Sequence, residues 1–320
     1  MAVKVFVAGG TGVLGRASLG PLVEAGYVVR STARGKDKAD LVRSLGAEPV
    51  ECDLYDPASV RQAMSGCDAV IRLTTKIGSV MKIRDARAWE ETNRLRTTGA
   101  RILVDAAVAT GVLAYLHESI TFVYADGDNN WLDESSPLDD AGSRILRSAL
   151  EGEQEAARFT QLGGRGMVLR FAGFYGEAAP STYEMIGMAR KRMLNQMGPA
   201  ANYFSSIYVP DAGRAVAAAV NAPAGVYNVC DDEPIIFAEY LRILTSAVGG
   251  RKPLRLPGFL GKTMFGQAWN YFSRSTRVSN AKLKQATGWT PQMKSAREGW
   301  PVVVAALKAQ TDGAGIRKAA

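Results

Sequence analysis

Three glycines near the N-terminus have the type and spacing that binding of a phosphate group requires. Gly9, Gly12 and Gly15 follow an apolar, β-branched run in VAGGTGVLGRA and precede a segment with helical spacing. Glycine permits a tight turn there and lets backbone N–H groups approach a pyrophosphate at the helix N-terminus. A ligand-free glycine turn is the plainer alternative, but a triplet that opens a strand–helix series favours nucleotide binding. The residues expected to contact the nucleotide here are Gly9, Thr11, Gly12, Val13, Leu14, Gly15 and Arg16.

A second group of reactive side chains lies at the end of a later apolar run, in YLHESITFVYA. His117 could act as a general acid because its ordinary pKa is near neutral, although a packed, hydrogen-bonded histidine is the more common outcome. Glu118 would be buried at a strand end, where a carboxylate needs either a partner or a function. Ser119 and Thr121 offer hydroxyls and Tyr124 offers a phenol, but packing or strand-end hydrogen bonding would explain each of them as well.

Alternating strand-like and helix-like runs predict the scaffold that would hold both groups. Apolar, β-branched runs recur over 3–9, 27–33, 47–53, 68–74, 113–119 and 165–171, with helical apolar spacing between them. This alternation predicts βαβ units with right-handed crossovers, and hence an α/β fold with a Rossmann-type, doubly wound parallel sheet. The expected helices include a long one over roughly 86–110 and another over 143–161.

The pattern loosens beyond Phe171. FAGFYGEAAPSTY, over 171–183, is rich in Gly, Ala and Pro and is predicted to be a loop. A further strand is expected at 224–231, and much of the remaining chain has helical spacing. The predicted division is a nucleotide domain over 1–170 plus 205–229 and a smaller, helix-rich C-terminal substrate lobe over 171–204 plus 230–310. The tail at 311–320 is expected to fray.

The order of motifs resembles the extended and atypical short-chain dehydrogenase/reductases, the group that contains NAD-dependent epimerases and dehydratases. The matching segments are the glycine loop, ECDLYDP, CDAVIRLTT, VLRFAGFYG, SSIYVPDAGRAV, GVYNVCDDEP and RVSNAKLKQATGWTP, which together span most of the chain. The resemblance implies a nicotinamide dinucleotide cofactor. By the same resemblance, the residues near it are Asp53 and Leu54 at the adenine, Leu73, Thr74 and Thr75 beneath the cofactor, and Asn93 as the family's helix asparagine.

The family's catalytic helix is present in outline but lacks its two catalytic residues. The family pattern YxxSKLExE aligns with ILRSALEGE, so the tyrosine position holds Ile145 and the lysine position holds Ala149. In the family that lysine, one turn further along the same helix face, lowers the pKa of the tyrosine that donates the proton. The catalytic hydroxyl position on the preceding strand holds Ile120, flanked by Ser119 and Thr121. The usual proton relay is therefore excluded.

The end of the second predicted strand bears on which nicotinamide cofactor binds. A cofactor with a free ribose 2′-OH is usually met by a carboxylate there, but this position holds Ala33. Arg34 follows it, and Arg16 follows the third glycine, so two guanidiniums could meet a 2′-phosphate. Solvated surface charge is the alternative for both. The missing acid together with the neighbouring bases predicts NADP(H) in preference to NAD(H).

The composition argues against several other classes of function. With 320 residues, 47% hydrophobic and 22% charged, the chain has an ordinary globular composition and no apolar run that could span a membrane. Its three scattered cysteines favour a reducing, cytoplasmic location, and one histidine without a CxxC motif argues against a metal site. Net charge is +8 and is densest over 251–284, but no nucleic-acid-reading motif accompanies it. We expect no nucleic-acid partner, no membrane partner and no metal.

The sequence therefore predicts an atypical NADP(H)-dependent reductase acting on a small, apolar or ring-bearing carbonyl or enone compound. Two alternatives stay open: a non-catalytic NADP(H)-binding redox sensor, which loss of the Tyr–Lys pair would suit, and a nucleotide-sugar epimerase or dehydratase. The resemblance also implies a homodimer through the helices at 86–110 and 143–161. Expected substrate contacts are Phe174, Tyr175 and Tyr203, with Tyr183, Phe204, Trp269, Tyr271 and Phe272 as further aromatics of the lobe.

Overall fold

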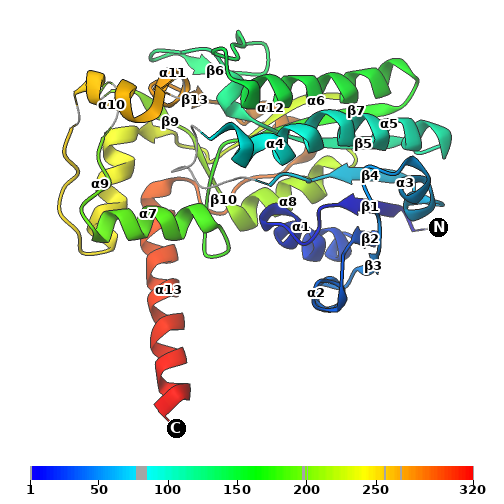
Figure 1. The fold of residues 1–320 in the computed structure, drawn as a ribbon, viewed down its shortest axis with the longest axis horizontal. Coiled ribbons are helices and arrows are strands. Elements are labelled where there is room, and N and C mark those ends of the chain that lie inside the picture. Colours follow the sequence, from blue (N-terminus) through cyan, green and yellow to red (C-terminus); the bar gives the residue numbers. More distant parts are fainter. Residues whose placement is uncertain are drawn as a thin grey trace.

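Seven parallel strands form the central sheet of the computed structural model (Figure 1). The structure describes residues 2–76, 85–196, 199, 201–255, 257–266 and 269–319, without the side chains of 264, 265, 271, 272 and 311–319. The strand order is β11-β7-β5-β4-β1-β2-β3, so the predicted Rossmann-type, doubly wound α/β fold is confirmed. The strands are β1 (Lys4–Ala8), β2 (Val28–Thr32), β3 (Glu48–Val50), β4 (Ala69–Arg72), β5 (Ala114–Ile120), β7 (Arg165–Phe171) and β11 (Gly225–Val229).

Helices cover both faces of this sheet because its strands are apolar on both sides. One face packs against α1, α2 and α8, through a core that includes Leu19, Val42 and Val216. The opposite face packs against α3, α5 (Ala100–Ala109) and α6, through Val60, Leu103 and other apolar side chains. The helices are α1 (Val13–Glu24), α2 (Lys36–Ser44), α3 (Pro57–Met64), α6 (Arg144–Gln161) and α8 (Val209–Ala219).

The long helix predicted over 86–110 is interrupted. α4 (Ala86–Arg94) passes into a π-helical turn, η2 (Leu95–Gly99), before α5 (Ala100–Ala109) completes the run. π turns inside helices are rare and occur frequently at functional sites. Arg96 within this turn is only 2% exposed, so a guanidinium lies inside the domain. Apolar periodicity carries no signal for such a turn, which is why one continuous helix was expected.

The C-terminal lobe packs around aromatic side chains. Tyr175, Tyr240 and Trp300 lie in its core, and the ring centroids of Tyr175 and Trp300 are 5.5 Å apart. Around them are α7 (Pro180–Arg190), α9 (Phe237–Ala247) and α13 (Ala296–Ala319). The other helices are η3 (Thr121–Val123), α10 (Gly258–Phe265), α11 (Trp269–Phe272) and α12 (Ala281–Thr287). The short strand pairs are β8 (Gly173–Tyr175) with β10 (Ser206–Tyr208), β9 (Tyr203–Phe204) with β12 (Ile235–Ile236), and β6 (Trp131–Leu132) with β13 (Arg277–Val278).

One expectation about this half of the chain is wrong. The segment 171–183 is not simply a loop, because β8 and the start of α7 lie within it. β8 pairs with β10, a partner distant in sequence, and local composition cannot reveal such a pairing. The domain boundaries stay a prediction, although β11 joins the sheet. α13 is helical through Ala319, but the side chains of 311–319 are outside the described residues, so fraying of the tail also stays a prediction.

Within the described chain, no helix has the length and apolar character needed to cross a membrane.

Candidate functional site

The predicted cofactor residues meet at the carboxyl ends of the strands. β1 and β4 are neighbours in the sheet, yet the chain continues from β1 toward β2 and β3 on one side, and from β4 toward β5 and β7 on the other. Ligands of such sheets bind in the crevice at this switch point. The segments that reach it are the glycine loop after β1, Arg34 after β2, Asp53 and Leu54 after β3, and Leu73, Thr74 and Thr75 after β4.

The glycine loop is built for close approach. Gly9 has a φ of 99°, and a Cβ at this position would lie 2.7 Å from the carbonyl oxygen of Leu73. A Cβ on Gly15 would lie 2.2 Å from the Gly9 carbonyl oxygen, so both positions require glycine. Gly12 is the N-cap of α1 and has no side chain that could cap it. The first N–H groups of α1 therefore stay open to an anion, as phosphate binding needs.

Two orphaned hydroxyls at the strand ends support the fit of a dinucleotide. Thr74 Oγ1 and Ser31 Oγ are buried and have no hydrogen-bond partner among the described residues. By contrast, the Thr32 hydroxyl accepts a hydrogen bond from the Gly9 N–H at 2.9 Å, which fixes the loop against β2. An uncapped helix, a glycine cradle and an unpaired hydroxyl at the end of β4 are features that a bound dinucleotide would complete. The residues present thus fit the cofactor.

The adenine-proximal end is polar and open to solvent. Asp53 is exposed, and its carboxylate accepts from the Tyr55 N–H at 3.0 Å, which holds the segment as a turn. Leu54 is half-buried against the sheet core. Arg16 and Arg34 are both exposed, and neither forms an ion pair with a described carboxylate. Their place beside the strand ends leaves both guanidiniums free for a ligand.

A buried arginine ties the ends of β4 and β5 together. The Arg72 guanidinium donates to the carbonyl oxygens of Thr74 at 2.7 Å and Glu118 at 3.2 Å, and lies 3.4 Å from His117 Nε2. The Glu118 carboxylate lies 3.9 Å from Arg72 and accepts a hydrogen bond from the Thr75 hydroxyl. Arg72 is thus the cationic partner that a buried Glu118 required. Thr75 is half-buried, whereas Arg72 and Glu118 are buried.

His117 is a packed histidine in the interior. It has no exposed surface, and its Nδ1 lies 3.3 Å from the Tyr115 hydroxyl. Burial lowers the pKa of His117 well below its ordinary value, and the positive charges of Arg72 and Arg96 lower it further. The ring is therefore neutral near pH 7 and surrounded by protein, which disfavours a role as a charged acid.

Two other predicted catalytic residues, Ser119 and Tyr124, belong to a second buried hydrogen-bond network near the end of β5. The Ser119 hydroxyl donates to Glu153 at 2.6 Å, and Arg170 pairs with both oxygens of that carboxylate at 2.9 and 2.6 Å. Arg170 also donates to the Tyr124 hydroxyl at 3.0 Å, which in turn donates to Asn228 at 2.8 Å. Burial raises the pKa of Tyr124 to about 12. These hydroxyls stabilise the junction of β5, β7 and α6.

α6, predicted from the resemblance to be the catalytic helix, presents an apolar surface at the predicted positions of the Tyr–Lys pair. Ala149 is 1% exposed and packs in a small cluster with Val123 and Leu146, and Ile120 packs against the same cluster. Ile145 is half-buried. This cluster, on α6 and the end of β5, offers no proton donor to a reactant.

The face of α6 toward α4 is polar instead. Ser148 donates to the Asn93 side-chain oxygen at 2.8 Å, which joins the family's helix asparagine to the catalytic helix. The Arg96 guanidinium donates to the Ile145 carbonyl oxygen at 3.3 Å. Burial lowers the pKa of Arg96 to about 10, partly offset by the Glu118 carboxylate. A guanidinium from the π turn therefore contacts the backbone of Ile145, the predicted position of the family's tyrosine.

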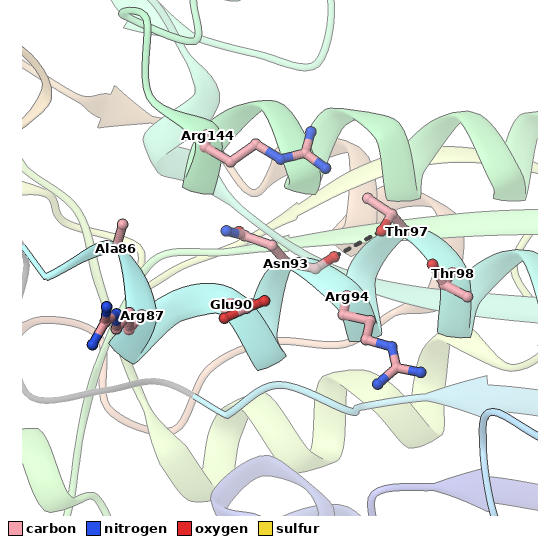
Figure 2. Close-up of a pocket in the computed structure, with 8 residues that line it drawn as sticks. All are labelled: Ala86, Arg87, Glu90, Asn93, Arg94, Thr97, Thr98 and Arg144. Carbon is pink, nitrogen blue, oxygen red and sulfur yellow. Dashed lines mark hydrogen bonds between the residues drawn. The ribbon is translucent and has the colours of Figure 1, made fainter.

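A groove of about 480 Å³ follows the solvent side of α4 (Figure 2). Asn93 reaches it, and its backbone oxygen accepts from the Thr97 hydroxyl at 3.0 Å. Arg144 projects toward the groove from α6, while the other side chains come from α4 and η2 (Figure 2). The lining residues are Ala86, Arg87, Glu90, Asn93, Arg94, Thr97, Thr98 and Arg144.

Comparison with known proteins agrees with this geometry. The profile of the NAD dependent epimerase/dehydratase family matches residues 5–230. The chain belongs to this family. A 3-diazoavenalumate denitrifying reductase from a Streptomyces species is 31% identical over 315 residues, which cover 92% of this chain and 98% of the relative. A ceramide reductase of Caulobacter vibrioides is 24% identical over 306 residues, covering 93% and 89%.

Solved structures of other family members share the fold. A UDP-glucose 4-epimerase from Thermotoga maritima superposes with a TM-score of 0.77 at 19% identity, covering 97% of this chain and 100% of that one. The human epimerase family protein SDR39U1 with NADPH gives a TM-score of 0.76 at 19% identity, covering 94% and 99%. As an epimerase/dehydratase family member with reductase relatives, the protein is an NAD(P)-dependent oxidoreductase of the short-chain type that binds a nicotinamide dinucleotide and takes a small-molecule substrate.

The three residues predicted to contact substrate, Phe174, Tyr175 and Tyr203, each pack against a different side chain. Phe174 packs edge-to-face on Phe171, and Tyr203 lies under the Arg277 guanidinium. Tyr175 has no exposed surface and is stacked on Trp300 in the lobe core. Their contact with substrate stays a prediction. The side chains of Tyr271 and Phe272, two further aromatic residues of the predicted lobe, lie outside the described residues.

One predicted catalytic residue remains to be described, together with the buried charged residues that the sequence analysis did not predict. Thr121 is 3% exposed in the turn η3 after β5. Among the described residues, no group of three potential metal ligands is present. The missed residues are Arg72, Arg96, Glu153 and Arg170. Arg72, Arg170 and Glu153 could have been predicted from the sequence. A charged residue within an apolar strand or on the inner face of a helix must find a partner.

Proposed function

We propose that this oxidoreductase is an NADP(H)-dependent reductase of a small, apolar or ring-bearing carbonyl or enone compound. The observation that carries the proposal is an intact dinucleotide cradle beside an apolar helix face, where Ile145 and Ala149 replace the family's proton relay. The bound nicotinamide would supply the hydride. The contribution of the chain is to hold the dinucleotide and to orient an apolar acceptor.

The preference for NADP(H) rests on the residues beside β2. Ala33 offers no carboxylate to a free ribose hydroxyl, and Arg16 and Arg34 are exposed cations without a described ion-pair partner. A 2′-phosphate would gain charge-assisted hydrogen bonds from both guanidiniums.

The proton for a carbonyl acceptor is proposed to come from water. Ser119, Tyr124 and His117 are committed to buried partners. Thr121 is 3% exposed, and the half-buried Thr75 hydroxyl donates a hydrogen bond to the Glu118 carboxylate. We propose that a water molecule held beside Thr75 and Glu118 gives its proton to the substrate oxygen and leaves as hydroxide.

A second candidate reaction needs no proton relay. The Streptomyces relative is named for reductive removal of nitrogen from a diazo compound. When a hydride replaces the N₂ group of an arenediazonium ion, a C–H bond forms, the C–N bond breaks, and N₂ leaves with that bonding pair. The charges then balance without an acid. An apolar wall in place of the Tyr–Lys pair favours a ring-bearing acceptor of this kind.

One assay tests these proposals together. The purified protein is mixed with NADPH or NADH and a panel of enones, ketones, quinones and 3-diazoavenalumate, while absorbance of the reduced cofactor and release of N₂ are followed. We expect NADPH oxidation with at least one ring-bearing compound. Tight NADPH binding without turnover on any compound would indicate a non-catalytic sensor. Faster turnover with NADH would contradict the cofactor preference alone.

A further inference from the structure

The second half of the chain contains a long stretch without any acidic residue. From Tyr240 to Arg297 there is no Asp or Glu, although the stretch is rich in Arg and Lys. It includes the region with the densest positive charge, which the oxidoreductase function does not explain. Its basic residues are Arg242, Arg251, Lys252, Arg255, Lys262, Arg274, Arg277, Lys282, Lys284, Lys294 and Arg297.

Some of these cations have partners from elsewhere in the fold, whereas others do not. Arg274 pairs with Asp139, Lys284 with Asp232 at 3.0 Å, and Arg297 with Glu233 at 3.0 Å and with Glu239. A second set of cations is exposed and forms no ion pair with any carboxylate in the described part of the chain. These cations are Arg251, Lys252, Arg255 and Lys262.

A second basic segment lies against this one. Arg190, Lys191 and Arg192, at the end of α7, are exposed and likewise without an ion pair to any described carboxylate. The backbone N–H of Gln196 donates to the Leu254 carbonyl oxygen at 2.9 Å, and a Cβ on Gly250 would lie 3.3 Å from the Ala189 carbonyl oxygen. The two segments are therefore neighbours. We call the surface formed by 190–193, 251–255 and 259–262 the basic edge.

Large apolar side chains project from the same edge. Leu254 is 73% exposed, Phe259 is 69% exposed and Met193 is 55% exposed, and Leu260 lies next to Phe259 on α10. Figure 1 shows the connection between α9 and α10 running along the left margin of the molecule, at the end of the lobe away from β3. Exposed apolar groups that lie close in sequence to unpaired cations on the same edge indicate an interaction surface.

We propose that the basic edge docks on the surface of an anionic lipid bilayer. Such a surface supplies both features that the edge demands: negative charge for the unpaired cations, and an apolar layer for Leu254, Phe259 and Met193. A nucleic acid would supply negative charge for the unpaired cations but would leave the apolar side chains in water. Surface docking needs no spanning helix, so it is compatible with the absence of one from the described chain. It differs from the prediction of no membrane partner made from the sequence.

Vesicle co-sedimentation of the full-length protein tests the proposal without any assay of turnover. Vesicles of phosphatidylcholine alone are compared with vesicles that also contain phosphatidylglycerol, at low and high salt. We expect binding only to the anionic vesicles, weakened by salt because the cations are exposed. No binding to anionic vesicles, or displacement of the bound protein by duplex DNA with DNA binding tighter than the vesicles, would overturn the proposal.

Charge-matched variants locate the contact. Arg251→Gln with Arg255→Gln should weaken anionic-vesicle binding by about tenfold or more, since each cation near such a surface contributes substantially. The control Arg61→Gln with Lys294→Gln removes two exposed cations outside the basic edge and should bind as the wild type does. Leu254→Ser with Phe259→Ser should also weaken binding. Full retention by either basic-edge variant, with cofactor binding intact in all of them, would show that this edge does not dock.

Discussion

The polar residues at the carboxyl end of β5 differ in how burial has changed their chemistry. His117 is neutral because burial and two guanidiniums lower its pKa, whereas burial raises the pKa of Tyr124 to about 12. Neither is well suited to deliver a proton near pH 7. The Glu118 carboxylate accepts a hydrogen bond from the Thr75 hydroxyl, and Thr75 is half-buried, so this pair is less enclosed than His117. Acid–base function at this site therefore depends on exposure more than on residue type.

Replacing Arg34 by Ala should weaken NADPH binding and spare NADH. The guanidinium is exposed beside the end of β2, and its loss removes a charge-assisted contact to the 2′-phosphate, a change worth roughly tenfold or more in affinity. Fluorescence titration with both cofactors measures it. Lys38→Ala removes a nearby exposed cation on α2 and serves as the control. An equal loss of affinity for NADH would contradict the assignment.

Replacing Asp231 by Asn should flatten the pH dependence of stability. Burial raises the pKa of Asp231 to about 8, above its ordinary 3.8, so the folded state keeps the proton longer than the unfolded state does. Stability from this group is complete at acidic pH and is lost as the pH rises through about 8. Between pH 6.5 and 8, above the ordinary pKa of His117, the wild type should lose up to about 1.4 kcal/mol per pH unit.

Urea unfolding across that pH range measures the effect of Asp231→Asn. The amide oxygen can still accept from Ser206 or from the Tyr208 N–H, which now contact the carboxylate at 2.9 and 3.3 Å. A variant that keeps the wild-type slope would show that another group titrates there.

The elements around the site are joined by buried charge as well as by apolar packing. Glu153 on α6 and Arg170 on β7 form a two-point ion pair whose side chains are 10% and 4% exposed. The hydrogen bonds from Ser119 and to Tyr124 extend this pair across the end of β5. The apolar wall of α6 is thus fixed in position by polar contacts behind it.

Glu153→Gln should destabilise the protein by about 3–5 kcal/mol, because it leaves the buried Arg170 charge without its partner. Chemical denaturation gives the free energy of unfolding. The matched control is Glu151→Gln on the same helix, whose ion pair with Arg144 is exposed and should contribute no more than about 1 kcal/mol. Similar losses in the two variants would show that burial of the Glu153–Arg170 pair does not set its strength.

At the scale of the whole molecule, the two ends carry different chemistry. The switch point of the sheet is the predicted dinucleotide site, and the lobe carries the basic edge at its far end (Figure 1). The outer faces of α4 and α6, where the resemblance implies a dimer, include a groove with Arg87, Arg94 and Arg144. Two copies that met there would bring like charges together.

We therefore predict a homodimer whose population rises with salt. Screening reduces repulsion between the guanidiniums, so the dimer fraction should increase when NaCl is raised from about 50 mM to about 500 mM. Sedimentation velocity measures it. Arg87→Gln should strengthen association at low salt, whereas Arg61→Gln, on α3, should not. A dimer fraction that falls with salt would contradict this interface.

The sequence by itself determined the parallel sheet and the glycine loop, and it predicts that the family's Tyr–Lys pair is absent. Strand runs such as 68–74 and 113–119 alternate with helical spacing, and glycines at 9, 12 and 15 have few other uses between a strand and a helix. Loss of the Tyr–Lys pair follows from Ile145 and Ala149 once the helix is aligned. These features are local, or they depend on spacing, and a linear pattern records both.

Only the tertiary structure decided which side chains pair and which remain free. Partners such as Arg72 with Glu118, Glu153 with Arg170, and Arg96 with the Ile145 carbonyl lie far apart in sequence, and burial makes each pairing obligatory. The π turn that holds Arg96 leaves no periodic trace. The basic edge likewise exists only because the end of α7 folds against the segment before α10.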